Sequence, residues 1–269
     1  MKGISLYSVI PVREEAREGA EQNTQILFGE TFDILEQIPR WNRVKLQLDG
    51  QEGWIDAKMC TPMADKEYDA YQKAYSQAAT IVFPMAYAMS ENNGQTIPLT
   101  AGTKLTNYQV LTANGANVGR FEVLGVGFRI DPSMVRTQPL ALNLQSLLET
   151  TRFFLNIPYL WGGKNAMGMD CSGFTQIVMS LFGIQLLRNA SQQATQGTPV
   201  ASLKEAKAGD LVFFDHEDGK ISHVGIVIDP ERVIHCSGRV KVEKLDKTGI
   251  YNIEQGGYSH HLVSIVSFR

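Results

Sequence analysis

The 269-residue sequence contains only three cysteines, Cys60, Cys171 and Cys236, and they are widely separated. Three scattered cysteines cannot form a disulfide framework, and the absence of a C-x-x-C pair removes the common signature of a structural zinc site. The sequence also lacks a run of about 20 apolar residues, so no insertion into a membrane is expected. The cysteines therefore raise one question, which is which of the three thiols is reactive.

Neither sign of charge dominates: 25 Lys and Arg oppose 28 Asp and Glu, a formal net charge of -3 at pH 7. Because no long run of one sign occurs, nucleic acid is not an expected partner. Glycine and proline are close to average usage, which excludes collagen-like and low-complexity disordered chains. At about 150 residues per domain, the length predicts two domains or three small ones.

The N-terminal segment has one basic residue, Lys2, then a short apolar mixture and an early Pro11, which is not typical of a secretory signal. We therefore expect a cytoplasmic protein, with a periplasmic or extracellular location as the alternative if a signal has been removed. A monomer is the expected oligomeric state.

The first 62 residues alternate apolar and polar positions between turn residues about every eight to twelve positions, which predicts a small β-barrel with strands at 24–28, 31–36, 43–48 and 53–55. Aromatic residues at helical spacing predict a linker helix at about 65–79. A second strand-rich run, 81–130, predicts a second small barrel.

From about Asn143 the pattern becomes mixed α and β. A helix is predicted from Leu144 to Phe154, ending ahead of Pro158 because the residue before proline disfavours helical geometry. Its apolar face would consist of Leu144, Leu147, Leu148 and Leu155. A second helix should run from Cys171 to Gly183, since glycine suits a left-handed C-terminal cap. Strands are predicted at 210–214, 221–228, 233–237 and 262–266.

Cys171 lies in the first turn of that second helix, within Asp-Cys-Ser-Gly-Phe at 170–174. Unpaired N–H groups and the positive end of the helix dipole favour a thiolate there, which makes Cys171 the candidate nucleophile. An isolated cysteine is more often a buried structural residue, and this is the interpretation of Cys60 and Cys236.

Four motifs occur in order around this cysteine: Tyr-x-Trp-Gly-Gly at 159–163, Asp-Cys-Ser-Gly-Phe at 170–174, Ala-Gly-Asp-Leu-Val-Phe-Phe at 208–214 and His-Val-Gly-Ile at 223–226. Together they resemble the NlpC family of cell-wall cysteine peptidases, which have a papain-like fold. Leu-Phe-Gly-Glu at 27–30 and Gly-Trp-Ile at 53–55 resemble the bacterial SH3-like domain. The implied fold is α+β, with two SH3-like barrels at 1–62 and 81–138, a helical linker at 63–80 and a peptidase domain at 139–269.

The resemblance implies that Cys171 is the nucleophile, His223 the general base and then acid, and His235 the residue that orients His223. Tyr159 would lie near the developing oxyanion, with the Cys171 N–H as a second donor. Substrate contacts are implied for Trp161, Asp170, Ser172, Arg188 and Asn189. Trp54 and Trp161 are core or substrate walls, and the wall interpretation is favoured for Trp161, which borders the nucleophile.

Whether His235 reaches His223 depends on strand register. Alternating side chains place His223 and Gly225 on one face of their strand, so His235 must pair with an odd-numbered residue, ideally one of these two.

His260 and His261 could form a metal site with His235 and Cys236, but the side chains of neighbouring strand residues point in opposite directions. At most one of the two could join, and we expect neither metal nor cofactor. His216 is expected in a solvated turn.

The implied reaction is hydrolysis of the amide between γ-D-Glu and an L-diamino acid in peptidoglycan stem peptides. Members of the family with paired barrels resemble endopeptidases that cut free L-Ala-γ-D-Glu-diamino-acid fragments during cell-wall recycling. Asn189 stands where the family has a carboxylate for the substrate's ammonium. Either recognition of the amine is weaker, or an acid such as Glu52 or Asp56 beside Trp54 takes this role. A wall-binding scaffold and a thiol acyltransferase are the alternatives.

Overall fold

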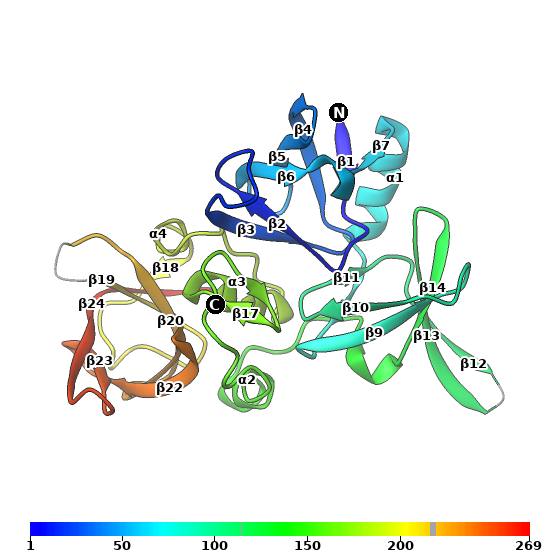
Figure 1. Cartoon of the computed structure of the whole chain (residues 1–269). Coiled ribbons are helices and arrows are strands. Elements are labelled where there is room, and N and C mark those ends of the chain that lie inside the picture. Colours follow the sequence, from blue (N-terminus) through cyan, green and yellow to red (C-terminus); the bar gives the residue numbers. More distant parts are fainter. Residues whose placement is uncertain (114, 216–218) are drawn as a thin grey trace. The chain divides into compact units, whose positions relative to one another are not determined.

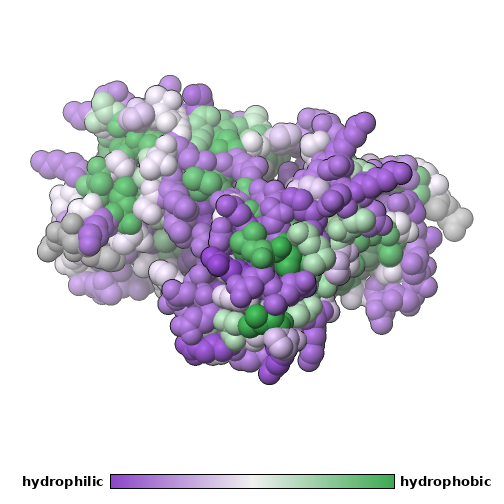
Figure 2. Space-filling view, turned by 90° about the horizontal axis from the view of Figure 1, so that it is seen from above, coloured by the Kyte–Doolittle hydropathy of each residue, from purple (hydrophilic) through white to green (hydrophobic). Residues whose placement is uncertain are grey.

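The computed structural model describes residues 1–113, 115–215 and 219–269, which divide into two units, 1–139 and 140–269 (Figure 1). His216 lies outside the described residues. Hydrophilic side chains cover most of the face shown in Figure 2, with separate apolar patches between them. In the described part of the chain, no helix is long and apolar enough to cross a membrane.

The first unit begins with an antiparallel sheet in the order β3-β2-β6-β5-β4-β1-β7. Its strands are β1 (Lys2–Ile4), β2 (Val9–Arg13), β3 (Gln22–Leu27), β4 (Thr31–Ile38), β5 (Trp41–Leu46), β6 (Glu52–Asp56) and β7 (Thr61–Met63). Alternate side chains such as Ile10, Val12 and Val44 are fully buried and form the core of this small barrel. The four strands expected here are present, with their ends moved by a few residues.

The helix α1 (Asp65–Tyr75) follows the barrel and packs into the unit. The hydroxyl of its buried Tyr71 donates to the carbonyl of Gly29 at 2.8 Å. The ring of Phe28 in the barrel meets that of Phe128 edge-on, with centroids 5.6 Å apart, and the ring of Phe128 stacks on that of Phe121, with centroids 5.1 Å apart. Residues from the barrel, the helix and the later strands therefore share one apolar core.

The later strands of this unit form two small antiparallel sheets, in the orders β10-β9-β14-β13-β12 and β11-β8-β15. They are β8 (Ala79–Ile81), β9 (Met85–Ser90), β10 (Thr96–Thr100), β11 (Lys104–Leu105), β12 (Gln109–Ala113), β13 (Ala116–Val123), β14 (Val126–Ile130) and β15 (Val135–Arg136). Two short 3-10 helices, η1 (Ala57–Met59) and η2 (Pro132–Met134), complete the unit.

The second unit is built on an antiparallel sheet in the order β18-β24-β19-β20-β21-β22-β23, and β23 pairs back onto β24. The strands are β18 (Thr198–Pro199), β19 (Leu211–Asp215), β20 (His223–Asp229), β21 (Arg232–Ser237), β22 (Arg239–Leu245), β23 (Gly249–Asn252) and β24 (Gly257–Ser267). The added pairing closes six strands around an apolar interior that includes Val212, Phe214, Val227 and Val233.

Three helices and a short hairpin complete the second unit: α2 (Leu144–Thr151), β16 (Lys164–Asn165), β17 (Gly168–Met169), α3 (Cys171–Leu181) and α4 (Ala190–Gln193). The predicted start of α3 at Cys171 is confirmed, and Gly183 just beyond its end has the expected positive φ of 79°. Helix α3 packs against β20 and β21. This contact brings the helix start to the beginning of β20.

The predicted apolar face of α2 is wrong at three leucines, which are between 39% and 44% exposed: Leu144, Leu148 and Leu155. The buried stripe consists of Leu147, Thr151 and Phe154, and the helix ends at Thr151. A spacing of four residues keeps Leu147 and Thr151 on one face of the helix, and Phe154 follows in the turn after it, whereas the prediction considered only apolar positions and passed over Thr151.

Candidate active site

Cys171 is the first residue of α3, and Asp170 caps this helix by accepting the Gly173 N–H at 2.6 Å. Cys171 is 6% exposed as a residue, and its thiol donates to the carbonyl of Ser222 at 4.0 Å. The N–H of Val224 also hydrogen-bonds the sulfur. The thiol therefore lies against the backbone on both sides of His223.

Burial raises the pKa of the Cys171 thiol to about 12, and the Asp170 carboxylate adds to this effect. The Val224 N–H and Arg188 act in the opposite direction but do not compensate. The thiolate that the helix start was expected to favour is opposed by loss of hydration, which raises the pKa more than the backbone N–H groups of Ser172 and Val224 lower it. The resting thiol is neutral at pH 7 and needs a base.

The two histidines of the second unit's sheet meet as the register argument predicted. Gly225 of β20 pairs with His235 of β21, and His223 Nε2 lies 2.8 Å from His235 Nδ1. A β-carbon at position 225 would lie 3.0 Å from His235 Cβ and 2.5 Å from Val233 Cγ2, so glycine makes room for the pair. The two histidines therefore share one face of the sheet.

Glu243 of β22 continues this row of side chains and was not anticipated from the sequence. Its Oε2 lies 2.8 Å from His235 Nε2 and 3.1 Å from Lys241 Nζ. Burial acts to raise the pKa of Glu243, but hydrogen bonds from His235 and Lys241 outweigh it and lower the pKa. Burial lowers the pKa of His235, against an opposing effect of Glu243, so this imidazole is neutral at pH 7.

His260 of β24 is a third histidine on this face. Its ring stacks on that of His223, with centroids 4.1 Å apart and planes at 28°. Its Nδ1 lies 2.9 Å from the Ser259 hydroxyl. The prediction that at most one of His260 and His261 joins the site is thus consistent with strand alternation, and among the described residues no group of side chains has metal-binding geometry.

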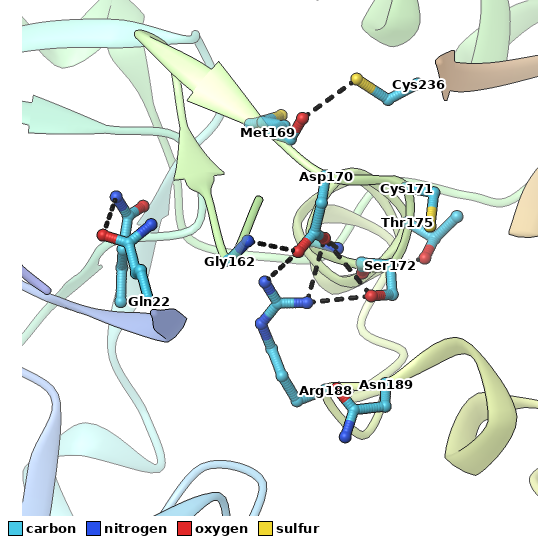
Figure 3. A network of polar contacts seen from close by, with 12 residues as sticks. Gln22, Gly162, Met169, Asp170, Cys171, Ser172, Thr175, Arg188, Asn189 and Cys236 are labelled. Atoms are coloured by element: carbon cyan, nitrogen blue, oxygen red, sulfur yellow. Dashed lines mark hydrogen bonds and ion pairs between the residues drawn. The ribbon is translucent and has the colours of Figure 1, made fainter. Parts of the chain in front are cut away.

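Asp170, Arg188 and Ser172, which were expected to contact substrate, are bonded to one another and buried (Figure 3). Arg188 donates to both Asp170 oxygens, at 3.0 and 2.6 Å, and to the Ser172 hydroxyl at 2.9 Å. Asp170 also accepts the Gly162 N–H at 2.9 Å. A bidentate pair of this kind fixes geometry as well as charge, so the network ties the 159–163 loop to the start of α3.

The loop at 159–163 places Tyr159 and Trp161 near this network. The Tyr159 N–H donates to Gly238 O at 2.9 Å. Burial raises the pKa of Tyr159, with further effects of Cys171 and Asp170, so the phenol keeps its proton and can donate. Trp161 is 59% exposed, which excludes the core interpretation and agrees with a wall.

The remaining candidate residues have local partners. Asn189 is exposed at the start of α4, and its N–H donates to Gln192 Oε1 at 3.0 Å. Cys236 is buried and its thiol donates to Met169 O at 3.1 Å, in line with a structural role. In the first unit, Trp54 and Cys60 are half-buried.

The two carboxylates proposed to replace the family's acid also lie in the first unit. Glu52 of β6 forms ion pairs with Arg43 at 3.0 Å and Lys45 at 3.5 Å. Asp56 caps η1 by accepting the Lys58 N–H at 2.9 Å. Both are partly exposed, so these contacts leave each carboxylate accessible to solvent.

A cysteine at a helix start beside paired histidines on antiparallel strands defines the class of thiol hydrolases with a papain-like site. Residues 156–265 match the NlpC/P60 family, and residues 12–58 match the bacterial dipeptidyl-peptidase Sh3 domain. The chain therefore carries an NlpC/P60 domain preceded by a bacterial SH3 domain, as the motifs predicted.

Two curated relatives extend the similarity over both units. The gamma-D-glutamyl-L-lysine dipeptidyl-peptidase of Bacillus subtilis is 29% identical over 224 residues, covering 79% of this chain and 71% of the relative. The protein of the same name from Bacillus cereus is 26% identical over 231 residues, covering 79% of this chain and 66% of the relative. The chain thus spans about two thirds of their length.

Solved structures show the same fold. An NlpC/P60 family protein from Bacillus cereus superposes with a TM-score of 0.83 at 18% identity, covering 100% of this chain and 99% of that one. An NlpC/P60 endopeptidase from Photobacterium damselae superposes with a TM-score of 0.70 at 15% identity, covering 98% of this chain and 72% of that one. The expected NlpC-type domain with an N-terminal SH3 domain is confirmed.

Asp170→Ala should lower the free energy of unfolding by about 3–5 kcal/mol, because it removes a helix cap and leaves the Arg188 charge buried without its carboxylate. Glu254→Ala is the matched control, since it breaks an exposed pair with Arg239, worth about 0–1 kcal/mol. Urea unfolding measures both. Equal losses in the two variants would show that the Asp170 network does not hold the site together.

Proposed function

We propose that the chain is a cysteine peptidase that hydrolyses the amide between γ-D-Glu and an L-diamino acid in peptidoglycan stem peptides. The observation that carries the chemistry is the 2.8 Å contact between His223 and His235 beside the buried Cys171 thiol. The substrate class is supported by the two Bacillus relatives, both named gamma-D-glutamyl-L-lysine dipeptidyl-peptidase.

In the proposed reaction, His223 takes the proton of Cys171 while the sulfur attacks the γ-carbonyl carbon of D-Glu. A carbon–sulfur bond forms and the carbonyl oxygen becomes an oxyanion, to which the Cys171 N–H and the Tyr159 hydroxyl donate. The raised pKa of the thiol makes proton transfer to His223 a requirement of this step. Attack and proton transfer are therefore coupled.

The tetrahedral intermediate then collapses, and the carbon–nitrogen bond breaks. His223 gives its proton to the departing amine of the diamino acid, which leaves the D-Glu γ-carbonyl as a thioester on Cys171. In the second half, His223 takes a proton from water, whose oxygen forms a bond to the thioester carbon. The carbon–sulfur bond then breaks, the carboxylic acid is released, and His223 returns the proton to the Cys171 sulfur.

We propose that Trp161 and Asn189 contact the substrate, as does the network of Asp170, Arg188 and Ser172. We also propose that the substrate must have a free N-terminus. The requirement is supported by the relatives' designation as dipeptidyl-peptidases, which denotes release of a dipeptide from an N-terminus. Glu52 is the first choice and Asp56 the second as partner of the substrate's ammonium. The role we propose is recycling of free L-Ala-γ-D-Glu-diamino-acid fragments by a cytoplasmic monomer.

We also propose that residues 81–138 form a second SH3-like barrel after a linker at 63–80. Its support is the succession of short antiparallel strands from β8 to β15, interrupted by turns with glycine at positive φ.

Cys171→Ala should reduce release of L-Lys from L-Ala-γ-D-Glu-L-Lys by at least about a thousandfold, because it removes the nucleophile. Cys60→Ala, the control, should retain activity. Chromatography of the released amino acid measures both, and circular dichroism verifies folding. A fully active Cys171→Ala variant would end the peptidase proposal.

N-acetylation of the same tripeptide should lower kcat/KM about 10- to 100-fold, because it removes an ammonium that forms a charge-assisted hydrogen bond. Glu52→Gln should lower kcat/KM for the free peptide alone. The control is Asp33→Asn, which breaks the ion pair of a comparable carboxylate with Lys2. Equal rates for free and acetylated peptide would mean that no carboxylate recognises the terminus.

A further inference from the structure

We propose that Glu243 is a positioning residue that determines which nitrogen of His223 can act as the base. This inference rests on the proposed cysteine-peptidase function and deepens it. It extends the Cys171, His223 and His235 arrangement by one carboxylate on β22.

The hydrogen-bond geometry leaves one consistent arrangement of protons. An ionised carboxylate can only accept, so the 2.8 Å contact with Glu243 requires the proton of neutral His235 to be on Nε2. Its Nδ1 is then an acceptor, and the 2.8 Å contact requires His223 to donate from Nε2. The Nδ1 of neutral His223 consequently carries no proton and can receive that of Cys171.

Without an acceptor at position 243, the two imidazoles could hold their protons in the opposite arrangement. His235 could carry its proton on Nδ1 and donate it to His223 Nε2, which would place the His223 proton on Nδ1. The imidazole would then present a donor to the thiol instead of an acceptor. Glu243 breaks the symmetry between these two states, because it accepts and cannot donate.

The charge of Glu243 should also stabilise His223 after it has taken the proton. The titratable and charged groups facing this row are Lys241 of β22, His260 of β24 and the Cys171 thiol of α3. Lys241 helps to keep Glu243 ionised in a position where its side chain is only 11% exposed. Weak screening at such a site allows the carboxylate to act through His235 on His223.

Two substitutions separate orientation from charge. Glu243→Gln has no charge but keeps an oxygen, and Lys241, which can only donate, holds this oxygen rather than the amide nitrogen toward His235. Glu243→Ala removes both the oxygen and the charge. Glu254→Gln is the control, since it neutralises a carboxylate of the same unit whose ion-pair partner is the exposed Arg239. We expect kcat to fall about 10- to 100-fold in Glu243→Ala with KM within about twofold, and no change in the control.

The pH profile has a defined sign. Activity is lost as pH falls, because a protonated His223 cannot accept the thiol proton. Removing the negative charge destabilises the imidazolium and lowers the pKa of His223, so the acid limb of kcat/KM should move to lower pH by about half a unit or more in Glu243→Gln. A residue with a merely structural role would leave this limb in place.

Two further readouts do not depend on the substrate. Nitrogen NMR of the imidazoles in a Cys171→Ala background should show that His235 and His223 are both protonated on Nε2. Adding Glu243→Ala should give a mixture of Nε2- and Nδ1-protonated imidazoles, whereas adding Glu243→Gln should leave both protons on Nε2. Iodoacetamide labelling of Cys171, followed by mass spectrometry of the labelled peptide, should show the same acid-limb shift as kcat/KM. If no tripeptide is cleaved, the proposed function fails while these two measurements still decide the role of Glu243.

The proposal is overturned by Nδ1 protonation of His235 in the otherwise unaltered site, or by an unchanged acid limb in both Glu243 variants. A coupling test completes the design. In a His235→Asn background, Glu243→Ala should cause no further loss of kcat, because Glu243 acts through His235. An equal additional loss would assign Glu243 an independent role and contradict the proposal.

Discussion

The Asp170 carboxylate is the constraint on which the rest of the site depends. It caps α3, accepts hydrogen bonds from Nη1 and Nη2 of Arg188, and accepts the Gly162 N–H. Three segments that are separate in sequence are thereby fixed around Cys171. The same negative charge contributes to the raised pKa of the thiol, so the interaction that organises the nucleophile also keeps it protonated.

Because the Cys171 thiol stays protonated, the site needs the base that the neighbouring strands supply. A buried neutral thiol needs a base of defined tautomer, and His223, His235 and Glu243 are diagonal neighbours on one face of β20, β21 and β22. The ring of His260 stacks on that of His223, at the end of this row opposite Glu243. Helix α3 and the sheet thus supply the two halves of one proton-transfer unit.

Local patterns predicted the elements that carry this unit, including α3 starting at Cys171 and the pairing of His235 with an odd-numbered residue of β20, which is Gly225. Local patterns did not predict the features that depend on how side chains pack in the folded chain. The buried face of α2 and the raised pKa of Cys171 depend on surroundings far away in sequence. Glu243 could have been found by continuing the odd-numbered alternation past the turn at Gly238, whereas His260 reaches His223 only through pairings of β24.

The most direct test of the account is to trap the acyl group on Cys171. When L-Ala-γ-D-Glu-L-Lys is supplied with hydroxylamine, a thioester intermediate predicts L-Ala-γ-D-Glu hydroxamate formed together with free L-Lys. Acid-quenched protein should carry the dipeptidyl group on Cys171, located by peptide mass spectrometry. Release of L-Lys without hydroxamate, or a dipeptidyl group on any other side chain, would contradict a reaction through this thiol.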